Sequence, residues 1–257
     1  MGNSFWETQF VLDPPPAPVE RHGDVDLHLP PGDGRHPAVV VVHGVPGPPD
    51  APDARDWLLF RGYGALLAER GVVAAIPRLT VAHPDDLTTV AGRIVGTADL
   101  LRADPRVDPD RLALWFFSGA GLLLGDWLRE PPGWLRGLAA TYPLLAPLAE
   151  WPPIDPRFHP IDAVGGAARR PVGPNQPSAA DAVRSVPLVL TRVGRDRPEV
   201  ASSIDTFLAA AARHGSPVRV VDVPQGQHGF DALDHTDESR AAVRTARDAV
   251  LDLLTDP

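Results

Sequence analysis

The sequence contains no cysteine and no lysine. The missing cysteine excludes disulfides, thiolate metal sites and a cysteine nucleophile together. The 24 basic residues are all arginine, and no basic run appears in a chain whose net charge is −9. Because nucleic acids and anionic membranes bind basic patches, neither is expected as a partner. The missing lysine by itself indicates no function.

Long hydrophobic runs are missing as well, since every apolar run is far shorter than the ~20 residues of a membrane-spanning helix. The first residues, MGNSFWETQF, have neither the basic nor the apolar region of a signal peptide. They begin Met-Gly, but Trp6 stands where a myristoylation signal needs Ser or Thr. We therefore expect a soluble, cytoplasmic protein. No glycine-rich phosphate loop or dinucleotide fingerprint appears, so no cofactor is expected.

Proline, by contrast, is abundant, with 31 residues in a chain of 257. The length suits one large α/β domain with a substantial core, and most prolines stand between apolar runs, as they do in loops. Residues 144–184 are rich in Pro, Gly and Arg and lack regular periodicity. So long an irregular stretch inside a compact domain indicates a lid or a disordered insertion. We expect a single domain over residues 1–257, with 144–184 as its cap.

Apolar strands alternate with amphipathic helices along the chain. Helices are expected over 55–70, from Pro84, from Ser118, around 200–211 and after a cap at Thr236. This alternation implies right-handed crossovers and a mostly parallel sheet with helices on both faces. The expected strands are 23–30, 36–44, 72–76, 111–117, 135–143, 186–194 and 216–224.

Three polar residues each follow one of these apolar runs: Ser118, Asp196 and His228. The carboxyl ends of parallel strands form the ligand-facing edge of a sheet. A serine hydroxyl is a weak nucleophile and needs a neighbouring base, which His228 would supply before protonating the leaving group. Asp196 would hold the imidazole in the right tautomer. The order serine, acid, histidine is that of α/β-hydrolases, whereas chymotrypsin-like and subtilisin-like enzymes use other orders.

From about Gly23 to Leu254 the chain resembles the α/β-hydrolase superfamily, and most closely its dienelactone hydrolase-like esterases. The resemblance is carried by HGVPG after one strand, FFSGAG around Ser118, VGRD after a late strand and QGQHGF before the last helix. It implies the α/β-hydrolase fold and a serine hydrolase. It also implies an oxyanion hole made by the backbone N–H groups of Gly119 and Val45.

In the family, the serine sits on a sharp turn from strand to helix called the nucleophile elbow. The elbow of this chain departs from the family pattern G-x-S-x-G, because Phe116 stands where the first glycine belongs. A phenylalanine there must point elsewhere or be strained. Each member of the trio also has a structural alternative or a substitute. Ser118 can be a buried or helix-capping serine, and Asp196 can cap a helix while Glu199 takes its role. His228 lies in a glycine-flanked loop with no helical pattern, which argues against core packing.

The residues expected to line a substrate pocket are aromatic or apolar, and ordinary core packing is the alternative for most of them. Three arginines of the insertion either bind a substrate carboxylate or form a solvated face: Arg157, Arg169 and Arg170. The spacing of His228, Asp231, Asp234 and His235 matches no known metal-ligand signature, so no metal is expected. The candidate lining residues are Phe117, Tyr142, Leu144, Trp151 and Phe230.

These features together predict a cofactor-independent serine hydrolase that cleaves a carboxylic ester, a lactone or a thioester through an acyl-serine intermediate. The expected partner is a small-molecule ester or lactone, and a homodimer is left open. Two alternatives remain. In the first, Phe116 misbuilds the elbow and the chain is a hydrolase-like binding or scaffold protein. In the second, the same fold supports a non-hydrolytic lyase or cyclase.

Overall fold

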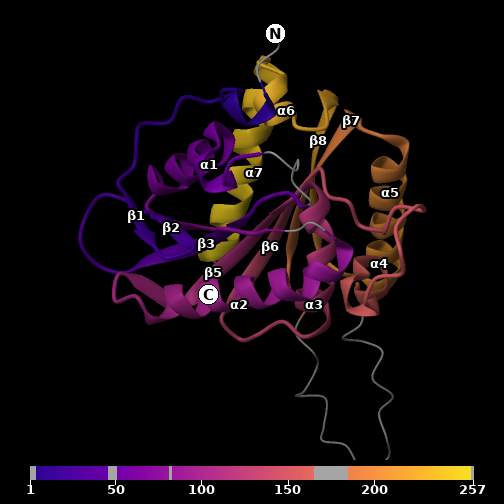
Figure 1. Cartoon of the computed structure of the whole chain (residues 1–257), viewed down its shortest axis with the longest axis horizontal. Helices are drawn as coiled ribbons and strands as arrows, with labels where there is room; N and C mark the ends of the chain where they lie inside the picture. Colours follow the sequence, from indigo (N-terminus) through magenta and orange to yellow (C-terminus); the bar gives the residue numbers. More distant parts are fainter. Residues whose placement is uncertain (1–3, 46–50, 81–82, 165–184, 256–257) are drawn as a thin grey trace, which may run out of the picture.

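The computed structural model describes residues 4–45, 51–80, 83–164 and 185–255. Within these residues, eight strands form one sheet in the order β1-β2-β4-β3-β5-β6-β7-β8 (Figure 1). Strand β2 runs antiparallel to both of its neighbours, and all other neighbouring strands are parallel. The strands are β1 Val19–His22, β2 Val25–His28, β3 His36–Val42, β4 Val73–Pro77, β5 Val107–Phe117, β6 Leu135–Thr141, β7 Leu188–Arg195 and β8 Val218–Gln227.

The first strand is the one that the sequence pattern did not indicate. A single strand was expected over 23–30, whereas the structure has a hairpin in which Gly23 turns between β1 and β2 with φ +58°. Strand β1 is exposed at all four residues, at the edge of the sheet, and so has no alternation of apolar and polar side chains. The six later strands overlap the expected ranges.

Helices cover both faces of the sheet (Figure 1). Helices α1 and α7 contact one face, and α2 and α5 contact the other. Thr236 caps α7 as expected, because its hydroxyl accepts the Ser239 N–H at 3.1 Å. No helix in the described part of the chain is long and apolar enough to cross a membrane. The α-helices are α1 Leu58–Ala68, α2 Leu87–Ala103, α3 Leu124–Arg129, α4 Pro160–Ala163, α5 Pro198–His214, α6 Phe230–Leu233 and α7 Asp237–Thr255, and the short 3-10 turns are η1 Phe5–Glu7, η2 Ala54–Asp56, η3 Pro84–Asp86, η4 Ser118–Leu123 and η5 Pro156–Phe158.

The sheet separates two hydrophobic cores, and β5 contributes side chains to both. Successive side chains of a strand point to opposite faces, so Leu114 and Phe116 lie in the core beneath α2 and α5. Trp115 and Phe117 lie in the core beneath α1 and α7. All four are at most 1% exposed. The end of β5 is therefore held firmly on both faces, which positions the residue that follows it.

The expected cap at 144–184 is described only as far as residue 164, and its remaining residues lie outside the described ranges. The described part contains η5 and α4 and packs against α3. A β-carbon at Gly125 would overlap the Arg157 carbonyl oxygen, so the two backbones touch. The Arg157 side chain also donates to the Asp126 carboxylate at 2.6 Å and 2.9 Å. This part of the segment is therefore attached to the domain.

Candidate active site

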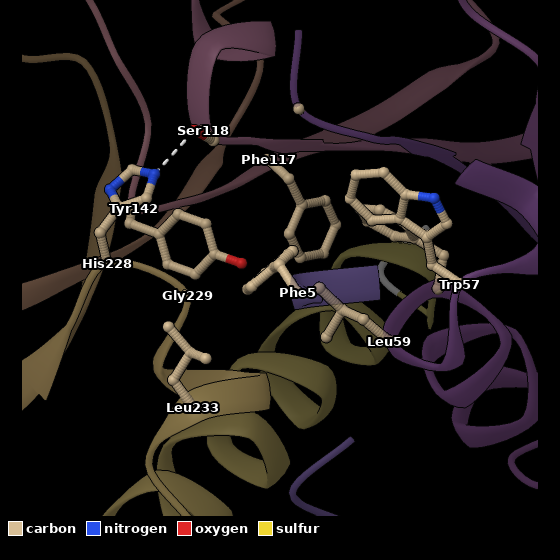
Figure 2. A pocket seen from close by; sticks show the side chains of 11 residues that line it. Phe5, Trp57, Leu59, Phe117, Ser118, Tyr142, His228, Gly229 and Leu233 are labelled. Carbon is tan, nitrogen blue, oxygen red and sulfur yellow. Dashed lines mark hydrogen bonds between the residues drawn. The ribbon is translucent and has the colours of Figure 1, made fainter. Parts of the chain in front are cut away.

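Ser118, Asp196 and His228 meet at one edge of the sheet, each directly after the last residue of β5, β7 or β8. The Ser118 Oγ lies 2.7 Å from the His228 Nε2 (Figure 2). The His228 Nδ1 lies 2.9 Å and 3.1 Å from the two Asp196 carboxylate oxygens. Because a carboxylate only accepts, Nδ1 carries the proton and Nε2 is left to accept the serine hydroxyl. The three side chains thus form one continuous hydrogen-bonded chain.

The backbone at Ser118 is in the left-handed region, with φ +51°. Such a conformation is uncommon for a residue other than glycine, costs backbone strain, and clusters at functional sites. Here it turns the chain sharply from β5 into η4 and directs the side chain to the sheet edge. Leu144 holds the turn by donating its N–H to the Ser118 carbonyl at 2.9 Å. Gly121 permits this approach, since a β-carbon there would lie 2.6 Å from the Leu144 carbonyl oxygen.

Phe116 does not obstruct the elbow. Its side chain is completely buried in the core beneath α2 and α5, on the side of the sheet away from Phe117. It thus points elsewhere, as the sequence required of a phenylalanine at this position. The close contact on the other side of Ser118 is made by Gly44, where a β-carbon would lie 3.1 Å from the Ser118 Cβ.

The loop after β3 lies against the residue that follows Ser118. A β-carbon at Gly119 would overlap the Val45 carbonyl oxygen and would stand 3.7 Å from the Val45 nitrogen. His43 holds this loop: its Nε2 accepts the Leu79 N–H at 3.2 Å, so its Nδ1 carries the proton that the Gly44 carbonyl accepts at 3.1 Å. Burial lowers the pKa of His43 to about 4, which keeps the imidazole neutral.

Asp196 is the acid that contacts His228. Its side chain is fully buried, whereas that of His228 is 26% exposed. One Asp196 oxygen also accepts the Arg197 N–H at 2.8 Å, which helps to fix the carboxylate. Glu199, which the sequence left as a substitute, lies exposed in the first turn of α5.

Beneath His228 lies a buried cluster of one carboxylate and two phenols. Tyr142 packs its ring against the His228 ring, with centroids 4.6 Å apart, and donates its hydroxyl to Asp231 at 2.8 Å. Tyr63 donates to the other Asp231 oxygen at 2.8 Å. Burial raises the pKa of Asp231 to about 6, although both hydroxyls act to lower it. The cluster therefore anchors the ring that supports the histidine.

A cavity of about 260 Å³ opens beside the Ser118 hydroxyl. Two of the predicted lining residues, Phe117 and Tyr142, belong to its wall. The other walls come from the N-terminal segment, the start of α1, and α6. The described lining consists of Phe5, Gly44, Trp57, Leu59, Phe60, Phe117, Ser118, Tyr142, His228, Gly229 and Leu233.

The other three predicted lining residues lie elsewhere in the structure. Leu144 is buried in the core beneath α2 and α5, and Trp151 packs against the same core. Phe230 is buried beneath α7 and meets the Tyr142 ring edge to face, with centroids 6.0 Å apart. The sequence pattern did not indicate Phe5, Trp57 or Leu233, because none of them follows a strand. The aromatic content of FWETQF, near the start of the chain, is a signal that could have indicated a packed segment there.

No protein-family model and no curated protein matches the chain. Solved structures match it in fold. A thermophilic esterase of the planctomycete Thermogutta terrifontis with butyrate bound aligns with a TM-score of 0.65 and 17% identity, over 95% of this chain and 97% of its own. Esterase 2 of that organism, phosphorylated by paraoxon, aligns with a TM-score of 0.63 and 18% identity over 95% and 98%. The protein DphMB1 aligns with a TM-score of 0.62 and 20% identity over 93% and 85%.

At these identities the likeness concerns the fold alone. The predicted α/β-hydrolase fold is confirmed, with its mostly parallel eight-stranded sheet and helices on both faces. Esterases are among these structural neighbours.

Proposed function

We propose that the chain is a cofactor-independent serine hydrolase that cleaves a carboxylic ester, lactone or thioester. The observation that carries the proposal is the hydrogen-bonded chain from Ser118 through His228 to Asp196, beside an open cavity. With the proton on Nδ1, the His228 Nε2 is free to take a proton from the Ser118 hydroxyl. The esterases among the structural neighbours support the same class of reaction.

In the proposed reaction, the Ser118 Oγ attacks the substrate carbonyl carbon and its proton passes to His228 Nε2. The tetrahedral intermediate collapses when His228 returns that proton to the leaving alcohol or thiol, and an acyl-serine remains. A water molecule then attacks the acyl carbon and gives a proton to His228. The bond between the acyl carbon and Ser118 Oγ then breaks as His228 returns the proton to Oγ, so the acid leaves and the Ser118 hydroxyl is restored. Asp196 stabilises the imidazolium that forms in each half-reaction.

The negative charge on the carbonyl oxygen needs donors that are in place beforehand. We assign this role to the backbone N–H groups of Gly119 and Val45, which lie on the two segments that meet beside Ser118. Removing one such donor typically costs roughly 10²–10³ in rate. The neutral, hydrogen-bonded His43 supports the assignment, because it holds the loop that carries Val45.

The motifs around Ser118, Asp196 and His228 further support a place near the dienelactone hydrolase-like esterases. A binding protein with an obstructed elbow is less well supported, since Phe116 packs into the core and the His228 side chain is 26% exposed. A non-hydrolytic lyase or cyclase differs in that turnover of its own substrate would survive loss of the Ser118 hydroxyl.

Labelling with a fluorophosphonate probe tests the proposal directly. We expect one adduct per chain by intact mass in the wild type and none in Ser118→Ala or His228→Ala, because the probe reacts only with an activated serine. Ser202→Ala, which removes an exposed hydroxyl from α5, is the matched control and should label like the wild type. A folded wild type that forms no adduct would contradict the proposal.

A further inference from the structure

One wall of the cavity comes from the very start of the described chain. Phe5, in η1, meets Trp57 edge to face with ring centroids 5.9 Å apart. On its other side, Phe5 Cε2 would lie 3.0 Å from a β-carbon at Gly229. Figure 2 shows Phe5 in the middle of the lining, between Tyr142 and Trp57. The ring therefore bridges the space from the start of α1 to the residue that follows His228.

The segment behind Phe5 is anchored to the two helices that flank the cavity. Phe10 is 6% exposed and packs its ring onto α1, where a β-carbon at Gly62 would overlap it. Val11 donates its N–H to the Asp231 carbonyl in α6 at 2.9 Å. Because both anchors are buried, the position of Phe5 is set by the packing of the fold.

The described residues that line the cavity include no arginine that could pair with an anionic substrate group. Among the described lining residues, the titratable side chains are His228 and Tyr142, and the Tyr142 hydroxyl is already donated to Asp231. Of the three arginines considered for a carboxylate, Arg157 donates instead to Asp126 at 2.6 Å and 2.9 Å. Arg169 and Arg170 lie outside the described residues. A carboxylate entering this cavity would lose its water without gaining a cationic partner among the described lining residues, which is costly.

We infer that the cavity accepts a small, uncharged, apolar group of an ester, and that Phe5 is a specificity-determining residue. This inference rests on the proposed hydrolysis. The cavity volume of about 260 Å³ lies below the ~300–1,000 Å³ that is typical of pockets for drug-sized ligands. Phe5 limits the length of the group because it stands across the space between Trp57 and Gly229. Because the ring lines the cavity, removing it would enlarge the cavity on that side.

Two variants, one with a smaller and one with a larger side chain at Phe5, test whether this residue limits the length of the bound group. Ethanoate, butanoate and octanoate p-nitrophenyl esters probe the acyl side, and ethyl, butyl and octyl acetates probe the alcohol side. In each series we compare kcat/KM for the eight-carbon ester with kcat/KM for the four-carbon ester. We expect Phe5→Ala to raise this ratio by about tenfold or more in one of the two series, and Phe5→Trp to lower it. Trp6→Ala is the matched control: it removes a neighbouring ring that packs on Trp57 but does not line the cavity, and it should leave the ratio unchanged.

A matched pair of substrates tests the charge of the bound group. p-Nitrophenyl butanoate and mono-p-nitrophenyl succinate have acyl chains of equal length, but the second ends in a carboxylate. We expect the wild type to favour the butanoate by roughly 10²-fold in kcat/KM, because the carboxylate must be desolvated without a partner. Equal turnover of the two esters would overturn the inference that the group is uncharged.

The outcomes separate this inference from the proposed function. If the esters are hydrolysed in a Ser118-dependent way but neither Phe5 variant changes either length profile, the hydrolase proposal stands and the role of Phe5 is overturned. If folded wild type neither turns over any ester nor binds the fluorophosphonate probe, both are overturned. Circular dichroism and melting temperature of each variant show that a changed ratio comes from a folded protein.

Discussion

Ser118, in the left-handed region at φ +51°, shows how an elbow is built when a phenylalanine replaces the first glycine of the motif. Close approach is permitted instead at Gly44 and Gly121: a β-carbon would lie 3.1 Å from the Ser118 Cβ at Gly44, and would overlap the Leu144 carbonyl oxygen at Gly121. Phe116 is free to fill the core because β5 points it away from the loop after β3. A serine can therefore be placed at this edge without the first glycine of the motif.

Asp196→Asn tests the orienting role at the residue scale. An amide at this position can donate to His228 Nδ1, which would move the ring proton to Nε2 and leave no acceptor for the Ser118 hydroxyl. We expect kcat for a short ester to fall by roughly 10³–10⁴ while the melting temperature changes little. Steady-state kinetics on a p-nitrophenyl ester measure this. Glu199→Gln, at the exposed carboxylate nearby, is the control, and an equal loss in both variants would argue against the assignment.

Among the elements, α7 packs along one face of the sheet against β5, β6, β7 and β8. Its start is well defined, because the Thr236 hydroxyl accepts the Ser239 N–H at 3.1 Å and also bonds the Ser239 hydroxyl at 2.9 Å. Asp237 and Glu238 in the first turn add favourable charge near the positive end of the helix dipole. The amino end of the helix is thus stabilised by local chemistry that the sequence displays.

Thr236→Ala should remove this cap. We expect the free energy of unfolding to fall by about 1 kcal/mol, because an N–H of the first turn loses its acceptor. Urea denaturation followed by circular dichroism measures the change. Thr206→Ala is the matched control, since that hydroxyl only donates to the Ser202 carbonyl within α5, and a substitution there should stay within about 0.5 kcal/mol. Similar losses in the two variants would show that capping is not the cause.

The whole molecule carries buried titratable groups whose effects on stability oppose one another. Burial lowers the pKa of His28 and of His43 from 6.5 to about 4. Unfolding at a pH between these values lets both imidazoles bind protons, so their contribution to stability grows as pH rises through this window. Asp231, with its pKa raised from 3.8 to about 6, acts in the opposite direction, because the folded state holds its proton longer than the unfolded state does.

The two histidines add stability as pH rises, and only Asp231 removes it. We therefore predict that the urea midpoint rises between pH 4.5 and pH 7. Denaturation series at pH 4.5, 5.5 and 7.0 measure it. Asp231→Asn removes the opposing contribution and should make the rise steeper. His28→Gln should make it shallower. A midpoint that stays level or falls over this range in the wild type would show that the two histidines do not dominate acid stability.

Much of the fold could be predicted from the sequence, because buried parallel strands and amphipathic helices leave strong local periodicity. The strands that end before Ser118 and Asp196 are examples, and the cap at Thr236 is another. Strand β1 could not be predicted in this way, since an exposed edge strand pairs through its backbone and its side chains need follow no pattern. The catalytic assignments rest on chain order and chemistry, and they stay predictions until the labelling and kinetic experiments are done.

The sequence alone determined the class of fold and the residue types that follow the strands, because both depend on local pattern and on order along the chain. The tertiary structure alone decided which distant residues share the cavity. Phe5, Trp57 and Leu233 come together only when the N-terminal segment packs between α1 and α6. Likewise, Phe230 was a reasonable candidate by its position, but the turn of α6 buries it in the core. Contacts between segments far apart in sequence are set by packing, and no local periodicity records them.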